Sequence, residues 1–320
     1  MVNLIAALNI SEVAVIGLLV ASLQFATLLY LAALGETIAE KSGVLNLGVE
    51  GMMAVGAVVG YIAAVSTGSP WIGLLVGGLA GAAAAGVHAV IAVVLGADQV
   101  VSGLALTILG LGLANFIGDG YTDDPRRSLF VDLDLPGLSD IPWVGEVVFS
   151  ATPVTYLAVG LGVATWFALN RTSLGLGLRA VGESASTADA AGHGVTAMRI
   201  GAVLIGGLFA GFSGAYLTTT GIVGAWSEGL TAGRGWIAVA LVIFGAWRSG
   251  RAALGALLFG FTLALRNRLQ PFGVEFSPIL LSMLPYLLTV LVLIGISIKA
   301  RHQPSPAPAG LGTPYRREER

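Results

Sequence analysis

Residues 13–34 read VAVIGLLVASLQFATLLYLAAL, a run without a single charged side chain. A helix needs about 20 predominantly apolar residues to cross the hydrocarbon core of a bilayer, and this run is long enough to do so. Further runs of this kind lie near 44–66, 71–96, 99–118, 152–169, 200–223 and 278–298. The sequence therefore predicts an all-α fold, a polytopic transmembrane helical bundle.

The composition of the whole chain supports this class. Of its 320 residues 56% are hydrophobic and 11% are charged, with a mean hydropathy of +0.87, whereas soluble domains carry about 25% charged residues. The net charge of −2 gives no reason to expect a nucleic-acid partner, and the absence of cysteine excludes disulfides and thiolate metal sites. No basic residues precede the first apolar run, so a cleavable signal is not expected.

The region 236–268 is also apolar, but Arg248-Ser249-Gly250-Arg251 divides it into two pieces that are each short for a crossing. These pieces form either two short spans or one span and a re-entrant half-helix. A backbone end within the membrane must be covered by protein or face water, so broken helices tend to mark a transport pathway. The bundle then has eight or nine membrane segments, some of them broken or re-entrant.

The distribution of basic residues predicts the orientation, because cytoplasmic loops of membrane proteins are enriched in lysine and arginine. The loop 170–199, the turn 248–251 and the residues after Ile298 carry such side chains and are expected in the cytoplasm. The loop 119–151 is expected outside. Its acidic residues, which outnumber Arg126 and Arg127, are Asp119, Asp123, Asp124, Asp132, Asp134, Asp140 and Glu146.

The chain divides into a transmembrane domain, residues 1–298, and a tail, residues 299–320. Four prolines and few apolar residues predict that the basic tail is a flexible cytoplasmic end. Counting crossings back from the external loop puts the N-terminus outside, provided that 44–66 is a complete crossing. We therefore expect a multi-pass protein of the plasma (inner) membrane with a cytoplasmic C-terminus.

Polar residues interrupt the beginning of the second apolar run, in Gly43-Val-Leu-Asn46-Leu-Gly-Val-Glu50-Gly-Met-Met53. Asn46 and Glu50 share a face if the segment is helical, and the glycines weaken a helix there. Glu50 would lie roughly 10 Å inside the span, where a carboxylate must be paired, protonated or facing water. Two interpretations stay open: Asn46, Glu50 and Met53 line a transport pathway, or Glu50 makes a buried structural hydrogen bond to backbone.

Other polar residues within the spans have similar alternatives. Asn115, Thr107 and Gln99 line a polar route or bond across helices, and we keep Asn115 as a pathway candidate and Gln99 as a cross-helix bond. His88 is expected to be a packed histidine rather than a metal ligand. Small-xxx-small spacings at Gly56/Gly60, Gly77/Gly81 and Gly207/Gly211 predict close helix packing.

A second motif lies in the loop 170–199, where Gly182-Glu183-Ser184 precedes an alanine-rich stretch and Gly192. Ser186 with Asp189 fits the S-x-x-[DE] start of a helix, and Gly192 can take the left-handed conformation that ends one. A short helix with small side chains can enter a cleft on a partner protein, with Glu183 and Asp189 as charges that steer docking. On spacing alone, an ordinary solvated linker has equal weight.

These residues resemble the EAA-like coupling loop of the ABC-transporter permease family that serves branched-chain amino acids, ribose-type sugars and nucleosides. A Gly-Glu-Ser/Asn start, paired alanines and a closing Gly-Ile or Gly-Val recur in that loop. The matching residues are Gly182, Glu183, Ser184, Ala190, Ala191, Gly192 and Val195, with His193-Gly194 as a departure before the closing residue. The resemblance implies that this loop, with Asp189, couples the chain to ATPase subunits.

The first motif is similar, more narrowly, to nucleoside-type members of the family. The matching stretches are Glu40–Met53, Arg234-Gly-Trp-Ile-Ala-Val-Ala and Leu284-Pro-Tyr-Leu-Leu-Thr289, and the resemblance covers roughly residues 15–298. It implies a binding-protein-dependent importer that also contains cytoplasmic ABC ATPase subunits, a second permease subunit, homologous or identical, and an external substrate-binding lipoprotein. The permease itself is then expected to bind no cofactor and to catalyse no reaction, with ATP used by its partners.

A different class of transporter is the alternative. The chain has no G-x-x-x-x-G-K-[ST] and its lysines are Lys41 and Lys299, so it carries no P-loop. An ion-coupled secondary transporter of small polar solutes would use Glu50 as a proton or sodium site in a broken helix. An intramembrane hydrolase needs paired carboxylates, a Ser/His pair or H-E-x-x-H within the spans, and we identify none there. Dispersed histidines also give no sign of a metal site.

Overall fold

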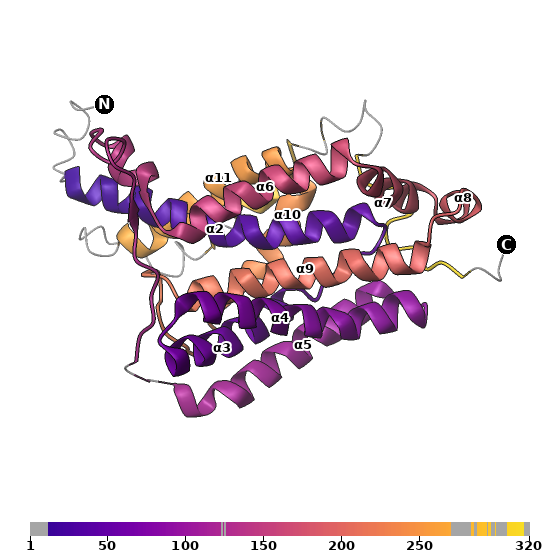
Figure 1. Cartoon of the computed structure of the whole chain (residues 1–320), viewed down its shortest axis with the longest axis horizontal. Coiled ribbons are helices and arrows are strands. Elements are labelled where there is room, and N and C mark those ends of the chain that lie inside the picture. The colour runs from indigo at the N-terminus through magenta and orange to yellow at the C-terminus, as the bar shows by residue number, and fades with distance from the viewer. Residues whose placement is uncertain are drawn as a thin grey trace.

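The computed structural model describes residues 12–122, 124, 126–269, 283–284, 287–292, 294–295, 298 and 306–316. Its long helices run alongside one another between two ends of the molecule (Figure 1). Helices α7 (Ser173–Glu183) and α8 (Ala185–Ala190) lie at one end, which we call the α8 end. The segment between α5 and α6 lies at the opposite end, which we call the loop end.

Among the described residues, six helices are long and apolar enough to cross a membrane. They are α2 (Glu12–Lys41), α3 (Val49–Thr67), α4 (Pro70–His88) continued by η1 (Ala89–Val94), α5 (Gln99–Gly118) continued by η2 (Asp119–Tyr121), α6 (Pro153–Arg171) and α9 (Val195–Thr218). They confirm the first six predicted runs and the all-α membrane bundle. The seventh run, 278–298, lies partly outside the described residues, and its described positions are helical.

The region 236–268 forms α10 (Arg234–Phe244) and α11 (Ser249–Leu269). The turn between them contains Ala246 and Trp247, both with positive φ (52° and 55°). With 11 residues α10 extends about 16 Å, half of a crossing, whereas the 21 residues of α11 extend about 31 Å. Residues 219–233, which precede α10, are not helical. The region therefore contains one full-length helix, α11, and one half-helix, α10. Helix α10 completes a crossing whose first part is the non-helical segment 219–233.

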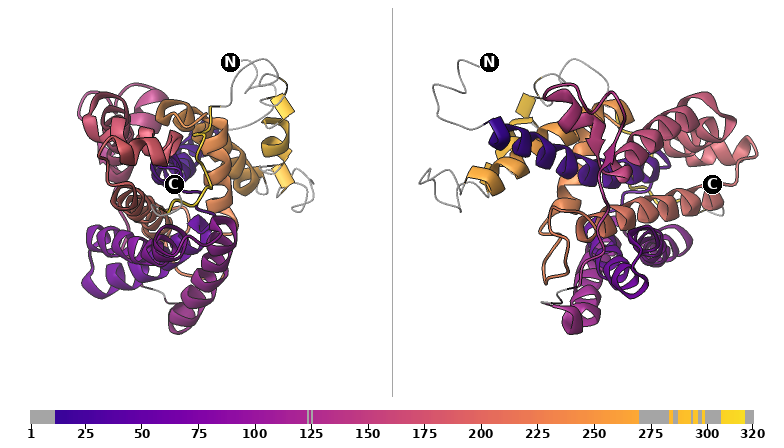
Figure 2. Two further views of the ribbon diagram at one scale, coloured as in Figure 1. Left: turned by 90° about the vertical axis from the view of Figure 1, so that its right-hand side faces the viewer. Right: turned by 60° about the vertical axis from the view of Figure 1, so that its left-hand side comes forward.

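The bundle packs around α9. Figures 1 and 2 show α3, α4 and α5 on one side of the molecule and α2, α6 and α11 on the other, with α9 between them. A Cβ atom on Gly211 of α9 would lie 2.3 Å from the carbonyl oxygen of Gly77 in α4, and one on Gly56 of α3 would lie 2.5 Å from the Cα of Gly211. Backbones therefore touch where the glycine spacings predict close packing.

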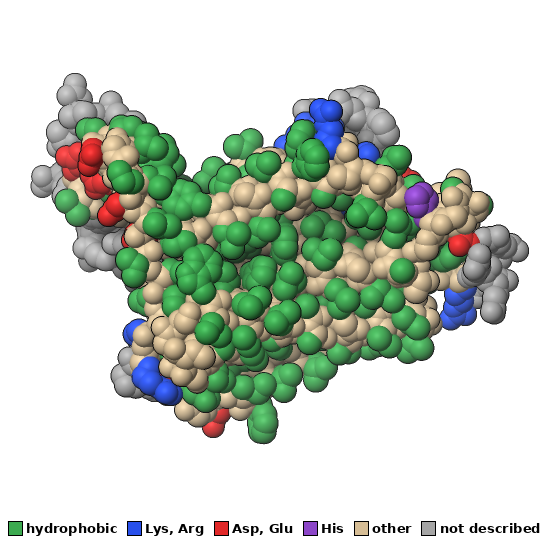
Figure 3. Space-filling view, in the orientation of Figure 1, with side chains coloured by type: hydrophobic (Ala, Val, Ile, Leu, Met, Phe, Trp, Pro, Cys, Tyr) green, Lys and Arg blue, Asp and Glu red, His purple; other side chains and the backbone are tan. Residues whose placement is uncertain are grey.

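The surface agrees with a membrane environment. Hydrophobic side chains cover the middle of the face in Figure 3, and charged ones gather toward its two ends. Phe116 is 83% exposed and Ile108 is 74% exposed on α5. Apolar exposure of this kind is unfavourable in water but matches contact with lipid chains, which supports a multi-pass membrane protein.

The loop end is built from residues 119–151, which contain β1 (Leu133–Asp134), η3 (Gly145–Phe149) and β2 (Ser150–Ala151). The two strands pair antiparallel, with Leu133 opposite Ala151. Arg126 forms an ion pair of 2.7 Å with Asp124, and this guanidinium holds the pKa of the Asp124 carboxyl below its usual range. The carbonyl of Arg126 accepts a hydrogen bond from Tyr61 of α3 (3.1 Å). This hydrogen bond connects the loop end to α3.

Part of the tail differs from the expectation of a flexible end. Residues 306–316 lie against the α8 end, where Gly310 N donates to the carbonyl oxygen of Gly182 (2.8 Å) and Gly312 N donates to that of Gly43 (3.1 Å). The Arg199 guanidinium donates to the carbonyl oxygen of Thr313 (3.0 Å). Backbone bonds hold this stretch together with apolar contacts of Ala307, Leu311 and Tyr315, so its low apolar content did not prevent it from packing. We call residues 306–316 the strap.

Candidate functional site

A non-helical segment, residues 42–48, connects α2 with α3 inside the bundle. Leu45 N donates to Oε1 of Gln99 in α5 (2.7 Å), and the carbonyl oxygen of Leu47 accepts from the hydroxyl of Thr107 (2.8 Å). Irregular backbone at membrane depth is stable only when such partners are supplied by protein or water. Gln99 and Thr107 therefore bond across helices and support the break in the crossing.

His88 supports the same segment from α4. Its Nε2 lies 3.2 Å from the carbonyl oxygen of Leu45 and its Nδ1 lies 3.0 Å from the hydroxyl of Ser102. The carbonyl can only accept, so Nε2 carries a proton and donates it to Leu45, while Nδ1 forms the bond with the Ser102 hydroxyl. The side chain is fully buried. His88 is therefore packed inside the bundle, with a protein partner at each ring nitrogen.

Asn46 holds the start of α3. Its backbone N–H donates to Oε1 of Glu36 (3.2 Å), its Oδ1 accepts from Gly48 N (3.0 Å) and its Nδ2 lies 3.5 Å from the sulfur of Met52. Gly48 is the N-cap residue of α3 and has no side chain with which to cap it. The buried amide of Asn46 therefore takes the place of a helix cap.

Glu50 joins the two broken crossings. Its Oε1 accepts from Gly233 N (2.8 Å) and its Oε2 accepts from Gly235 N (2.6 Å). Gly233 is the N-cap of α10 with φ of 80°, a conformation that glycine adopts without strain. Glu50 is 3% exposed. It belongs to the first turn of α3, and its carboxylate contacts the first turn of α10. The dipoles of both helices favour negative charge at these N-terminal ends. This geometry matches the second of the two interpretations of Glu50, a buried structural hydrogen bond to backbone.

The other two pathway candidates lie in different surroundings. Met53 is fully buried, and a Cβ atom on Gly214 of α9 would come within 2.0 Å of its carbonyl oxygen. Asn115 is half-buried, and its Nδ2 donates to Oε1 of Glu228, between α9 and α10 (3.0 Å). The structure therefore brings Asn46, Glu50 and Met53 together around the break and places Asn115 near the loop end.

Two buried carboxylates are additions that the sequence analysis missed. Helix α2 continues past the predicted run to Lys41, and it carries Glu36 and Glu40, both 1% exposed. Glu40 Oε2 accepts from the indole N–H of Trp247, in the turn between α10 and α11 (2.5 Å). The expectation that the spans hold neither paired carboxylates nor a Ser/His pair is thus wrong. Helix α2 is longer than its uncharged part, and His88 lies beside Ser102 across two helices. The E-x-x-x-E spacing at the end of α2 was the available signal for the carboxylates.

The predicted short helix of the second motif is present as α8. It begins after Ser184, whose hydroxyl accepts from Thr187 N (3.4 Å), so the cap is Ser184 and not Ser186. Gly192 has φ of 88°, the left-handed conformation expected at the end of a helix. His193 and Gly194 occupy the turn between α8 and α9, where His193 N donates to the carbonyl oxygen of Ala188 (3.0 Å).

One face of α8 is covered and another is open. Ala188 packs against Val181 and Val195 in a small apolar cluster, whereas Ser186 and Ala190 are exposed. Asp189 is half-buried. Glu183 is exposed, yet its Oε2 accepts from Ala309 N of the strap (3.2 Å). The open face of α8 is therefore formed by small residues.

Helix α7, which the sequence analysis did not anticipate, connects α8 with the bundle. A Cβ atom on Gly182 would lie 2.2 Å from the carbonyl oxygen of Lys41, so the end of α7 touches the end of α2. One residue before Lys41, Glu40 bonds to Trp247. The other end of α10 bonds to Glu50. An unbroken series of contacts thus leads from α8 to the middle of the bundle.

Comparison with known proteins identifies relatives over nearly the whole chain. The family model described as "Branched-chain amino acid transport system / permease component" matches residues 18–293. The putative glucose ABC transporter permease protein TsgC13 of Haloferax volcanii is 42% identical over 94% of this chain and 98% of its own length.

Two further relatives are named for other substrates. The guanosine ABC transporter permease protein NupQ of Bacillus subtilis is 37% identical over 92% of this chain and 95% of its own length. The nucleoside ABC transporter permease protein NupC of Lactococcus lactis is 34% identical over 85% of this chain and 89% of its own length. No solved structure matches the chain.

Proposed function

The chain belongs to the branched-chain amino acid transport system permease family, as the permease subunit of an ABC transporter, and from that premise we propose that it imports nucleosides. Its similarity to guanosine and nucleoside permeases supports this substrate, as does the Glu40–Met53 motif of nucleoside-type members. Similarity to a putative glucose permease makes glucose the competing substrate.

Energy comes, in this proposal, from separate ATPase subunits that bind at the α8 end, which then faces the cytoplasm together with the C-terminus. The open face of α8, with Ser186 and Ala190, lets a partner approach closely. Arg179 in α7, with Arg248 and Arg251 after the α10 turn, agrees with a cytoplasmic location. The chain itself then catalyses no reaction and binds no cofactor.

The series of contacts from α8 to Glu50 is the observation that carries the coupling mechanism. Movement of α8 and α7 displaces the end of α2, which is bonded through Glu40 to Trp247. Helix α10 then transmits that displacement to Glu50, whose carboxylate holds the start of α3. Two packings of the broken crossings, each favoured by a different nucleotide state of the ATPase, would provide alternating access.

The substrate pathway then runs beside the broken crossings and not through them. Asn46, Glu50 and Met53 are buried within the chain in this conformation, so their contribution is to hold the crossings in position. Asn115, half-buried and bonded to Glu228, is the candidate that meets a solute entering at the loop end. An external binding lipoprotein and a second permease subunit, homologous or identical, complete this proposed assembly.

Reconstitution into liposomes tests the proposed substrate and energy source together. The chain with its ATPase, second permease and binding protein is expected to take up radiolabelled guanosine when ATP is present on the ATPase side. Excess unlabelled guanosine should abolish this uptake, whereas excess glucose should leave it unchanged. Uptake of glucose with no uptake of guanosine would refute the nucleoside assignment and leave the ABC mechanism intact.

The same liposomes distinguish the ion-coupled alternative. Vesicles that contain the chain without an ATPase are expected to show no uptake under a proton or sodium gradient. Gradient-driven uptake by the chain alone would contradict the proposed energy source and would favour a secondary transporter with an ion site.

The docking surface is tested by adding bulk and charge to the open face of α8. Ser186→Arg with Ala190→Arg is expected to reduce co-purification of the ATPase at least about tenfold, because misplaced charge at an interface costs more than the roughly 1.4 kcal/mol that corresponds to tenfold. Gly120→Arg with Thr122→Arg adds the same charge at exposed loop-end positions and should leave co-purification unchanged. Equal recovery of the ATPase with both doubles would show that α8 is not the docking surface.

A further inference from the structure

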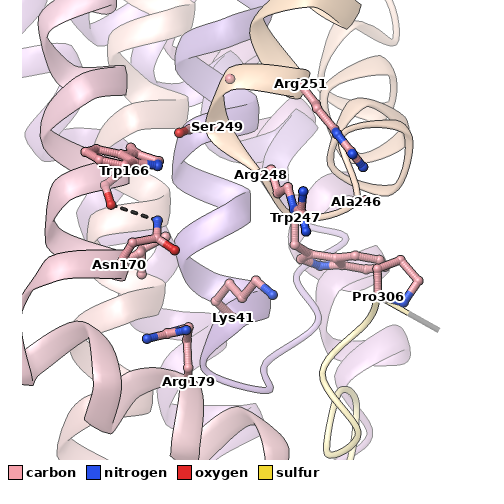
Figure 4. Close-up of a pocket in the computed structure, with 12 residues that line it drawn as sticks. Lys41, Trp166, Asn170, Arg179, Ala246, Trp247, Arg248, Ser249, Arg251 and Pro306 are labelled. Atoms are coloured by element: carbon pink, nitrogen blue, oxygen red, sulfur yellow. Dashed lines mark hydrogen bonds between the residues drawn. The ribbon is translucent and has the colours of Figure 1, made fainter. Parts of the chain in front are cut away.

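A cavity of about 630 Å³ opens at the α8 end between α6, α7 and the turn that joins α10 to α11. Four of the side chains that line it are basic: Lys41, Arg179, Arg248 and Arg251. Figure 4 shows Trp166 and Asn170 of α6 on one side of the cavity and Trp247, Arg248 and Arg251 on the other, with Lys41 and Arg179 toward its base.

The charge of this cavity favours an anion. None of the described residues that line it is acidic. The nearby carboxylates of Glu40 and Glu183 lie outside this lining, where Glu40 accepts from the indole of Trp247 and Glu183 accepts from Ala309 of the strap. Within the described chain, the one ion pair shorter than 4.0 Å joins Arg126 to Asp124 at the loop end. Cations that share one cavity repel each other unless an anion enters it.

The basic cavity continues into an apolar groove. A neighbouring hollow of about 250 Å³ shares Trp166, Ser249 and Gly250 with the cavity and is otherwise lined largely by apolar residues of α6 and α11. Val159 and Val163 on its wall are 59% and 62% exposed. Another hollow, of about 140 Å³, carries the groove further between the same helices. This side of the bundle has the apolar surface expected where lipid chains lie.

We propose that the cavity and the groove together bind one anionic phospholipid, with its headgroup phosphate among the four basic side chains and an acyl chain between α6 and α11. Basic pockets between transmembrane helices at the membrane surface recognise anionic headgroups in this way. Free phosphate would use the cavity and leave the groove without a ligand, whereas a zwitterionic lipid would leave the basic charge uncompensated. This proposed lipid site does not depend on which substrate the protein transports.

Tryptophan quenching by brominated lipid measures this binding directly, because Trp166 borders both the cavity and the groove. The purified full chain is titrated in detergent with phosphatidylglycerol brominated on its acyl chains, and separately with brominated phosphatidylcholine. Phosphatidylglycerol should quench at lower concentration, and Trp166→Phe should remove most of the quenching. Arg248→Gln with Arg251→Gln should weaken phosphatidylglycerol binding roughly thirtyfold.

Matched variants and competitors decide the outcome. Arg248→Lys with Arg251→Lys keeps the charge and should restore binding, and it still tests the site if the glutamine double fails to fold. Arg126→Gln with Arg127→Gln removes the same charge at the loop end and should leave binding unchanged. Equal quenching by phosphatidylcholine, or an equal loss with the loop-end double, would overturn the proposal. Displacement of the lipid by millimolar inorganic phosphate would reassign the cavity to free phosphate.

Discussion

Replacement of Glu50 by leucine is expected to abolish transport and to lower the midpoint of thermal unfolding by roughly 10 °C. The carboxylate accepts hydrogen bonds of 2.8 and 2.6 Å from Gly233 N and Gly235 N, and it is 3% exposed. Each hydrogen bond to a buried charge contributes about 1.5–3 kcal/mol, so loss of both costs about 3–6 kcal/mol. Thermal unfolding of the detergent-purified protein and ATP-driven uptake measure the two effects.

Two further variants make this result specific. Glu50→Gln keeps one acceptor oxygen but directs an amide N–H toward a backbone N–H, so its unfolding midpoint should lie between those of wild type and the leucine variant. Glu228→Gln changes an exposed glutamate and should leave the midpoint unchanged. Loss of transport by Glu50→Leu with an unchanged unfolding midpoint would contradict the structural role and would favour the pathway-lining interpretation.

Replacement of Gly211 by leucine is expected to prevent recovery of folded protein. A Cβ atom at this position would lie 2.3 Å from the Gly77 carbonyl oxygen and 2.9 Å from the Gly78 Cα. Both neighbours are backbone atoms that cannot rotate away, so the cost should reach or exceed the upper end of the roughly 1–3 kcal/mol typical of overpacking. The measurement is the yield of monodisperse protein in size-exclusion chromatography, together with its unfolding midpoint.

The matched control lies in the same helix. A Cβ atom on Gly201 of α9 would have no neighbour within 4 Å, so Gly201→Leu should give the yield of the wild-type protein. Gly211→Ala should be intermediate, because it places a Cβ atom but no further carbon in the crossing. Normal yield and stability of Gly211→Leu would show that α9 does not pack against α3 and α4 as described.

Much of the fold was predictable because its signal is local. An uncharged apolar run long enough to cross a bilayer indicates a span without knowledge of its neighbours. The arginines at 248 and 251 similarly marked the break between α10 and α11. The end of α2 was not predictable in this way, since Glu36 and Glu40 interrupt the uncharged run while the helix continues through them.

The candidate site was predictable in its members but not in its arrangement. The spacing of Asn46 and Glu50 within an apolar run identified residues that need partners. The partners of Glu50 are backbone N–H groups of Gly233 and Gly235, which are far away in the sequence and carry no side-chain signal. The bond between Trp247 and Glu40 could not be predicted either, because these two residues are also far apart in the sequence.

The strap has a consequence for the order in which the protein is made. Residues 306–316 bond to Gly43, Gly182 and Arg199 at the α8 end. They leave the ribosome only after every described helix from α2 to α11 has been translated. Until then the α8 end lacks the hydrogen bonds that the strap forms. A nascent chain therefore completes these contacts at the α8 end only after its described membrane helices have been made.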